Sequence, residues 1–107
     1  MRVGALRQRV TLEAPVRVAD GAGGADTAWN PVATLWADVA AAGGGEVTAG
    51  ERLEARTRLR VTIRFRAGVT PAMRLVWRGA ALNIRAVADR DGRRRFLSLD
   101  CEAGGAS

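Results

Sequence analysis

The stretch LRVTIRFRAG, residues 59–68, repeats with a period of two. Its apolar side chains are Leu59, Val61, Ile63 and Phe65. The alternate positions, counted from the residue before the stretch, are Arg58, Arg60, Thr62, Arg64 and Arg66. Strict alternation of this kind is typical of a strand with one face on a core and the other face outside. The sequence therefore predicts a half-buried strand over residues 57–66.

The same period recurs along most of the chain. We expect further strands over 7–14, 27–41, 73–79, 81–89 and 95–102, with the second of them broken at Asn30-Pro31 because proline donates no ladder hydrogen bond. Five to seven short strands with closely spaced turns favour a mainly β fold, a small antiparallel β-barrel or sandwich. The expected core is Val10, Leu12, Trp36, Val61, Ile63, Phe65, Leu75, Ile84 and Leu97.

The connections are rich in glycine. ADGAGGAD (19–26) predicts a flexible connection, and the Gly-rich segment after residue 41 leads into a predicted short helix near 47–55, where Thr48 and Glu51 have capping-box spacing. DRDGRRR (89–95) predicts a polar hairpin turn. Residues 1–107 are expected to form a single domain, with 103–107 as a loose C-terminal tail.

Composition limits the function. The chain has 107 residues and a net charge of +6, which suits an anionic partner such as nucleic acid. All 17 basic residues are arginine, as in a GC-rich genome, so no single arginine is diagnostic. One cysteine excludes an internal disulfide. We expect no membrane span and no secretory signal, because no apolar run is long enough.

No catalytic, cofactor-binding or metal-binding residue emerges from the sequence. Histidine is absent, and neither Gly cluster completes a phosphate-binding motif. The carboxylate pairs Asp89/Asp91 and Asp100/Glu102 fit a turn and an outward strand face better than a metal site. Cys101 lies on an apolar row, so we expect a buried, inert thiol. The protein is predicted not to be an enzyme.

Three interpretations of the arginine row stay open. It is a solvated outer face, a contact with DNA phosphates, or a seam between subunits. At a seam the arginines would meet carboxylates of a neighbour's 46–54 segment: Glu46, Glu51 and Glu54. No aromatic residue is interleaved on this row, so a base-stacking platform is not indicated.

Ordered motifs along nearly the whole chain resemble the tailed-phage head–tail joining family, also called head-closure, stopper or head–tail adaptor proteins. The opening GALRQRVTLEAPV is followed by DGAGGADTAWNPVATLWADV, in which Leu35-Trp36-Ala37 corresponds to a family element. Then come a Gly-x-Glu loop and the string RFRAGVTPAMR (64–74). LNIRAVADRDGRRRFLSLDCE matches the family's closing strands. The family often has Lys, His or Tyr where this chain has Arg, Leu59, Phe65 or Trp77.

The resemblance implies a structural virion component without a cofactor. Such proteins are made in the bacterial cytoplasm and form a ring in the neck, between the portal or adaptor ring and the tail terminator or tail proteins. The ring closes the filled head and passes double-stranded DNA without sequence specificity. Six subunits are favoured over twelve, and a phage, prophage or gene-transfer-agent particle would all fit. The alternative from the residues is a monomeric basic β-barrel module that binds nucleic acid.

A ring that must release DNA avoids a strongly basic wall. The resemblance therefore favours a subunit or ring-to-ring interface for Arg58, Arg60, Arg64 and Arg66. The two Gly-rich loops are the candidates for gating or docking, because glycine gives the backbone freedom between states. Their residues are Asp20, Gly21, Gly23, Gly24, Gly43, Gly44 and Gly45.

Overall fold

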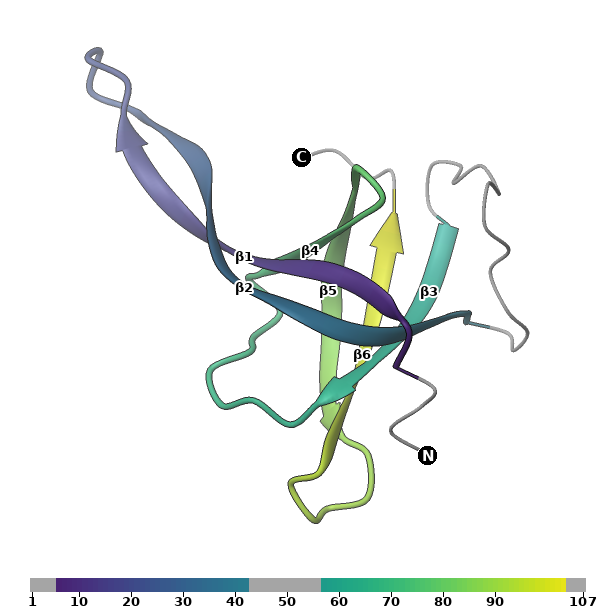
Figure 1. Cartoon of the computed structure of the whole chain (residues 1–107). Helices are drawn as coiled ribbons and strands as arrows, with labels where there is room; N and C mark the ends of the chain where they lie inside the picture. The colour runs from purple at the N-terminus through teal and green to yellow at the C-terminus, as the bar shows by residue number, and fades with distance from the viewer. Residues whose placement is uncertain (1–5, 43–56, 104–107) are drawn as a thin grey trace.

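Six antiparallel strands form a closed but uneven barrel in the computed structural model, which describes residues 6–42 and 57–103. The strands are β1 (Gln8–Ala19), β2 (Ala25–Ala41), β3 (Thr57–Arg64), β4 (Arg74–Trp77), β5 (Ala80–Asp89) and β6 (Phe96–Ala103). Around the barrel their order is β1-β2-β3-β6-β5-β4, and β1 pairs with β4 to close it (Figure 1). The predicted fold class is confirmed. The described residues contain no helix, and the helix predicted near 47–55 lies outside them.

The inward faces of all six strands form one apolar core. Alternation places one side of each strand inside, so the buried positions follow the period of two seen in the sequence. Fully or almost fully buried side chains are Val10, Leu12, Leu59, Val61, Ile63, Leu75, Trp77, Leu82, Ile84, Leu99 and Cys101. Trp77 is 2% exposed, and its indole Nε1–H donates to Gln8 Oε1 at 3.2 Å, so the ring is buried without an unpaired polar group.

Two residues predicted for the core are exposed. Trp36 is 52% exposed because Ala37 and Val39 occupy the inward positions of β2, which places Trp36 on the outer face. Phe65 is 37% exposed because β3 ends at Arg64, before Phe65, the fourth and last residue of the apolar row. Thr62 was expected on the exposed arginine row, yet it is 2% exposed and accepts a hydrogen bond from Arg90 Nη1 at 3.4 Å. The long Arg90 side chain covers it, as arginine stems often do.

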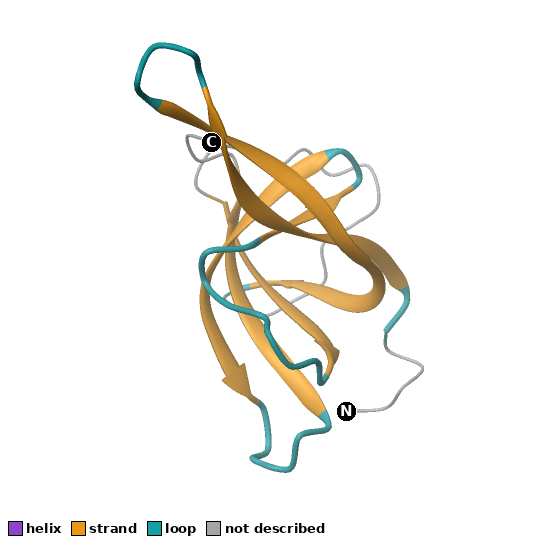
Figure 2. Ribbon diagram, turned by 90° about the vertical axis from the view of Figure 1, so that its left-hand side faces the viewer, coloured by secondary structure: helices purple, strands orange, loops and turns teal. Residues whose placement is uncertain are grey.

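The sequence predicted a break in this strand at Asn30-Pro31. That prediction is wrong, because β2 continues through both residues. The β1–β2 ladder instead shifts register between Leu12 and Glu13, where Ala33 and Pro31 are successive partners. Val32 is therefore an extra, unpaired residue, a β-bulge that lets the strand continue past the proline. Beyond this bulge the hairpin leaves the barrel, as Figures 1 and 2 show. We call the projecting part, residues 14–30, the arm.

A two-residue turn links β4 to β5, and a longer polar turn links β5 to β6. Arg78 and Gly79 both have positive φ, 51° and 79°, which matches the two-residue turn favoured between antiparallel strands. The predicted polar turn at 89–95 is present between β5 and β6. Ala103 was placed in the loose tail, but it is the last residue of β6 and is fully buried.

Candidate functional site

The arginine row of β3 is divided by the fold into two parts. Arg58 and Arg60 lie opposite Glu102 and Asp100 of β6 in the antiparallel register. Arg64 ends the strand, and Arg66 follows it in the next connection. All four side chains are exposed, as the alternation predicted, but their neighbours differ.

Of the two β6 carboxylates opposite the first part of the row, Asp100 pairs with Arg60, whereas Glu102 pairs with Arg85 of β5. Arg60 Nε lies 3.6 Å from Asp100 Oδ1, and Arg85 Nη2 lies 3.4 Å from Glu102 Oε1. The Arg60 and Asp100 side chains are 55% and 59% exposed, so solvent screens this pair and its contribution to stability is below about 1 kcal/mol. Both carboxylates of the Asp100/Glu102 pair thus lie beside arginines.

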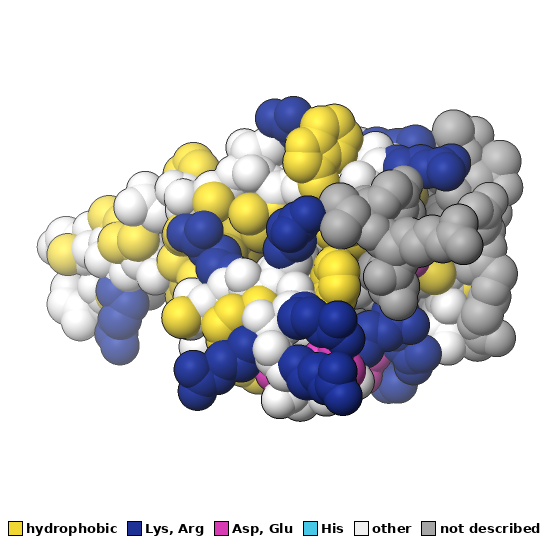
Figure 3. Space-filling view, turned by 60° about the horizontal axis from the view of Figure 1, so that its bottom comes forward, with side chains coloured by type: hydrophobic (Ala, Val, Ile, Leu, Met, Phe, Trp, Pro, Cys, Tyr) yellow, Lys and Arg dark blue, Asp and Glu magenta, His cyan; other side chains and the backbone are white. Residues whose placement is uncertain are grey.

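The second part of the row lines an open pocket of about 720 Å³, which we call the Trp36 pocket. Its apolar lining is Leu6, Leu35, Trp36 and Phe65, and its basic lining is Arg7, Arg64 and Arg66. The Arg9 guanidinium stacks over the Trp36 ring, 4.6 Å from the ring centroid, and thereby orients the indole. Arginine and exposed hydrophobic side chains lie next to one another on the face shown in Figure 3.

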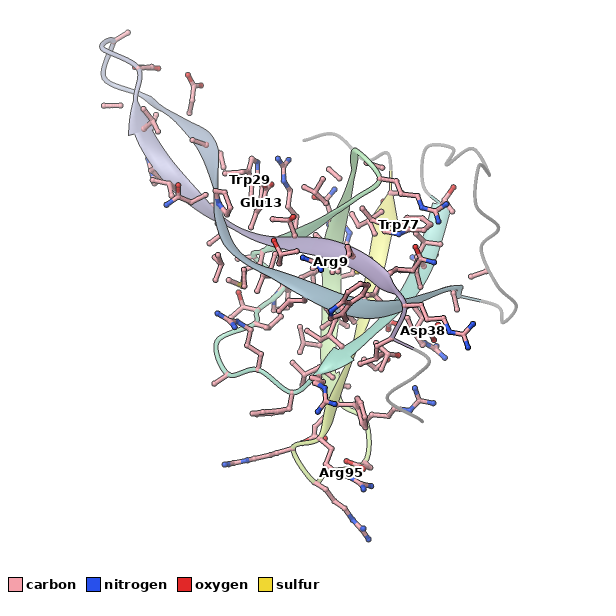
Figure 4. The ribbon with its side chains drawn as sticks, in the orientation of Figure 1. Arg9, Glu13, Trp29, Asp38, Trp77 and Arg95 are labelled. Carbon is pink, nitrogen blue, oxygen red and sulfur yellow. The ribbon has the colours of Figure 1, made fainter. Side chains whose placement is uncertain are left out.

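The base of the arm is held by a compact polar cluster. Arg74 Nε donates to Glu13 Oε1 at 2.7 Å, and both side chains are less than a fifth exposed. The Arg74 guanidinium also lies over the Trp29 ring, 4.3 Å from its centroid. Figure 4 shows Glu13 and Trp29 together where the hairpin leaves the barrel. The arm therefore leaves the barrel at a direction fixed by β4.

Beyond this base, no third strand among residues 6–42 and 57–103 pairs with the arm. Pairing of β1 with β4 stops at Glu13, and pairing of β2 with β3 begins at Ala37. The predicted loop residues Asp20, Gly21, Gly23 and Gly24 form the tip. There the Asp20 Oδ1 atom accepts hydrogen bonds from the backbone N–H groups of Ala22 and Gly24, at 2.8 and 3.1 Å. These hydrogen bonds close the tip as a hairpin loop.

The β5–β6 turn is a basic projection closed by its own aspartates. Asp89 accepts from the backbone N–H groups of Gly92 and Arg94. The backbone N–H of Arg93, followed by the side chain of Arg95, lowers the pKa of Asp91 below its ordinary value. These contacts show Asp89 and Asp91 acting as turn residues, as predicted.

The described residues also include one buried cysteine. Cys101 is 2% exposed, and burial raises the pKa of its thiol from 9.0 to about 12. Within residues 6–42 and 57–103, no three acidic, Cys or His side chains are grouped so as to hold a metal ion. The same residues contain no helix of the length and apolarity that a membrane crossing needs.

The predicted site residues are only partly brought together. Arg64 and Arg66 meet at the Trp36 pocket, whereas Arg58 and Arg60 lie beside β6. Glu46, Glu51, Glu54, Gly43, Gly44 and Gly45 lie outside the described residues. Sequence reasoning missed the Trp36 pocket because it assigned Trp36 and Phe65 to the core. The alternation of Leu35, Ala37 and Val39 was the signal that Trp36 faces outward.

Comparison with known proteins supports one family. The chain is 31% identical to a chain of the virion of a native gene transfer agent particle, with a TM-score of 0.69, covering 91% of this chain and 93% of that one. A protein of Shigella flexneri 2a, solved in solution, is 26% identical with a TM-score of 0.70, and each chain is covered in full. No curated protein matches. A family model described as phage head completion protein matches residues 1–104, and the chain therefore belongs to the phage head completion protein family.

Proposed function

We propose that this protein completes the DNA-filled head as a ring in the neck of the particle, between the portal or adaptor ring and the tail. The ring retains the packaged DNA and lets it pass during delivery. Membership of the head completion family, over residues 1–104, is the observation that carries this proposal. The likeness to a chain of a gene transfer agent virion supports a place in an assembled particle. Six copies form the ring.

The described surface is consistent with an assembly role. Its most distinctive features are a projecting arm and an apolar pocket with a basic lining, and both are features by which proteins dock. Arg58, Arg60, Arg64 and Arg66 meet neighbouring subunits or rings in this proposal. Asp20, Gly21, Gly23 and Gly24 at the arm tip, together with Gly43, Gly44 and Gly45, serve as docking or gating loops.

Cryo-electron microscopy of purified particles, focused on the neck, tests the function directly. We expect a ring of this small barrel between the portal or adaptor and the first tail ring, with a lumen wide enough for duplex DNA. Particles that assemble and package normally but lack the chain at the neck would overturn the proposal.

One observation favours a second function, a nucleic-acid-binding module. Trp36 and Phe65 are exposed among Arg7, Arg64 and Arg66, and aromatic side chains amid arginines can stack bases. However, Arg9 already occupies one face of the Trp36 ring, which leaves less surface for a base. This function predicts binding of single-stranded DNA by the isolated chain that falls steeply with salt and is lost in Trp36→Ala. The head completion function predicts weak binding, unchanged by that substitution.

A further inference from the structure

The exposed large hydrophobic side chains of the described residues fall into two groups. Val16 and Val18 lie on the arm, with Val32 at the bulge behind it, and Trp36 and Phe65 line the Trp36 pocket. Small proteins seldom leave contiguous apolar side chains exposed unless a partner covers them. The arm and the Trp36 pocket are therefore two candidate contact surfaces on one chain.

One face of the arm is apolar with an acid near its tip. In the antiparallel register Val16 lies opposite Ala28, and Val18 lies opposite Asp26, so these four share a face. Arg17 and Thr27, which pair with each other, point to the opposite face. The arm thus presents valines and a carboxylate on one side, and an arginine on the other.

A two-stranded ribbon of this kind is only marginally stable in water by itself. Within the part of the chain that the structure describes, no other strand lies beside the arm, yet its base is fixed by the contacts of Arg74 with Glu13 and Trp29. A ribbon with a fixed base and an uncovered apolar face is already shaped for docking, so little ordering cost remains when a partner covers it.

The Trp36 pocket has the complementary character. Its lining combines apolar side chains with Arg64 and Arg66, which suits a partner with apolar side chains and a carboxylate. The arm of the same chain does not reach it. Trp36 pairs with Arg9, and along an extended strand Val18 lies about 30 Å from that point. A second copy of the chain is the partner that offers the matching surface.

We propose that the arm of one subunit docks, by its Val16/Val18 face, in the Trp36 pocket of the next subunit. The two surfaces differ, so the contact is head-to-tail, and repeated head-to-tail contacts close into a ring when the rotation permits. This inference rests on the proposed ring and names the surfaces that join its subunits. Asp26 lies toward the arginines of the pocket in this arrangement.

Disulfide trapping in assembled particles tests the contact. The variant carries Val18→Cys and Phe65→Cys in a Cys101→Ala background, and the particles are oxidised and run on a non-reducing gel. We expect a ladder of multiples of 11.3 kDa that ends at the closed ring. Each single cysteine variant gives no ladder. The matched control, Arg17→Cys with Phe65→Cys, places the thiol on the opposite face of the arm and loses the ladder.

The other outcomes separate this inference from the function on which it rests. Dimers without a ladder would indicate a symmetric contact, and a product with another virion protein would assign the pocket to a different ring; either overturns the inference. A chain present at the neck but uncrosslinked overturns it as well, while the proposed function stands. A chain absent from the particles overturns the proposed function itself.

Discussion

At the scale of single residues, burial of one thiol governs the response of this protein to alkali. The chain contains no Lys, Tyr or His and one Cys, so Cys101 is the side chain that titrates between pH 9 and pH 12. Its pKa is raised to about 12 in the folded state because burial disfavours the thiolate. Arginines stay charged throughout this interval.

We expect the free energy of unfolding to fall as the pH rises above 9. Below that value both states keep the proton, whereas above it only the unfolded chain loses it, which favours unfolding by about 1.4 kcal/mol per pH unit. The decline ends near the folded pKa of about 12. Urea denaturation from pH 7 to 11 measures the slope. Cys101→Ala serves as the control, and an equal slope in that variant would contradict the assignment.

The β5–β6 turn offers a second prediction at this scale. Arg94 has a φ of 56°, a conformation that costs an L-residue with a side chain about 1 kcal/mol, so Arg94→Gly is expected to stabilise the fold by up to that amount. Gly92, with a φ of 72°, is the reciprocal control: Gly92→Ala has open space around it and still destabilises by about 1 kcal/mol. Thermal unfolding of both variants checks the signs, and two shifts of the same sign would refute this account.

At the scale of elements, the arm depends on how its base joins β4. The Glu13–Arg74 pair is mostly shielded from solvent and hydrogen-bonded at 2.7 Å, unlike the exposed Arg60–Asp100 pair. A charge left without its partner in such a site is costly. The Glu13–Arg74 pair is therefore expected to contribute more to the free energy of unfolding than the exposed Arg60–Asp100 pair, although the sequence alone does not distinguish the two.

Glu13→Ala is accordingly expected to lower the free energy of unfolding by about 2 kcal/mol, since a charge-assisted hydrogen bond is lost and Arg74 remains shielded. Asp100→Ala, at the exposed pair, is expected to cost less than about 1 kcal/mol. Urea denaturation measures both. Replacing both Glu13 and Arg74 by Leu should cost less than Glu13→Ala alone, and a larger loss in the double variant would argue against this explanation.

At the scale of the whole molecule, the proposed assembly predicts which arginines are needed to form particles. Arg60→Glu together with Arg64→Glu is expected to reduce the yield of DNA-filled particles strongly, because both parts of the arginine row would then repel their proposed neighbours. The control, Arg93→Glu with Arg94→Glu, makes the same change in net charge at the β5–β6 turn. Counting filled heads by electron microscopy measures the yield. Normal yield in the first variant would exclude the arginine seam.

The barrel needs no neighbouring subunit to form its core. Its core is complete within one subunit, because the inward faces of all six strands cover one another. Among the described residues, the exposed large hydrophobic side chains lie outside this core, on the arm, at the bulge and in the Trp36 pocket. A contact of that kind adds stability only at concentrations or on templates that assemble it.

The strand content, the turns and most of the core can be predicted from the order of the residues alone. Alternation is a local property, so Val61, Ile63 and Leu75 could be assigned inward without knowing what they face. The same is true of the buried Cys101 and of the turn aspartates. The family resemblance, carried by ordered motifs, was confirmed over residues 1–104.

The bulge, the arm and the Trp36 pocket could not be predicted in this way, because they depend on pairing between segments that are distant in the sequence. The register shift that leaves Val32 unpaired turns an apparent strand break into a continuous β2 and sets the arm apart from the barrel. The end of β3 at Arg64 exposes Phe65, and the outward side of β2 exposes Trp36, so two large side chains that composition assigns to a core form a pocket instead. Hydrophobicity favours the burial of a side chain, but strand register decides whether that side chain faces the core of its own barrel or the outer surface.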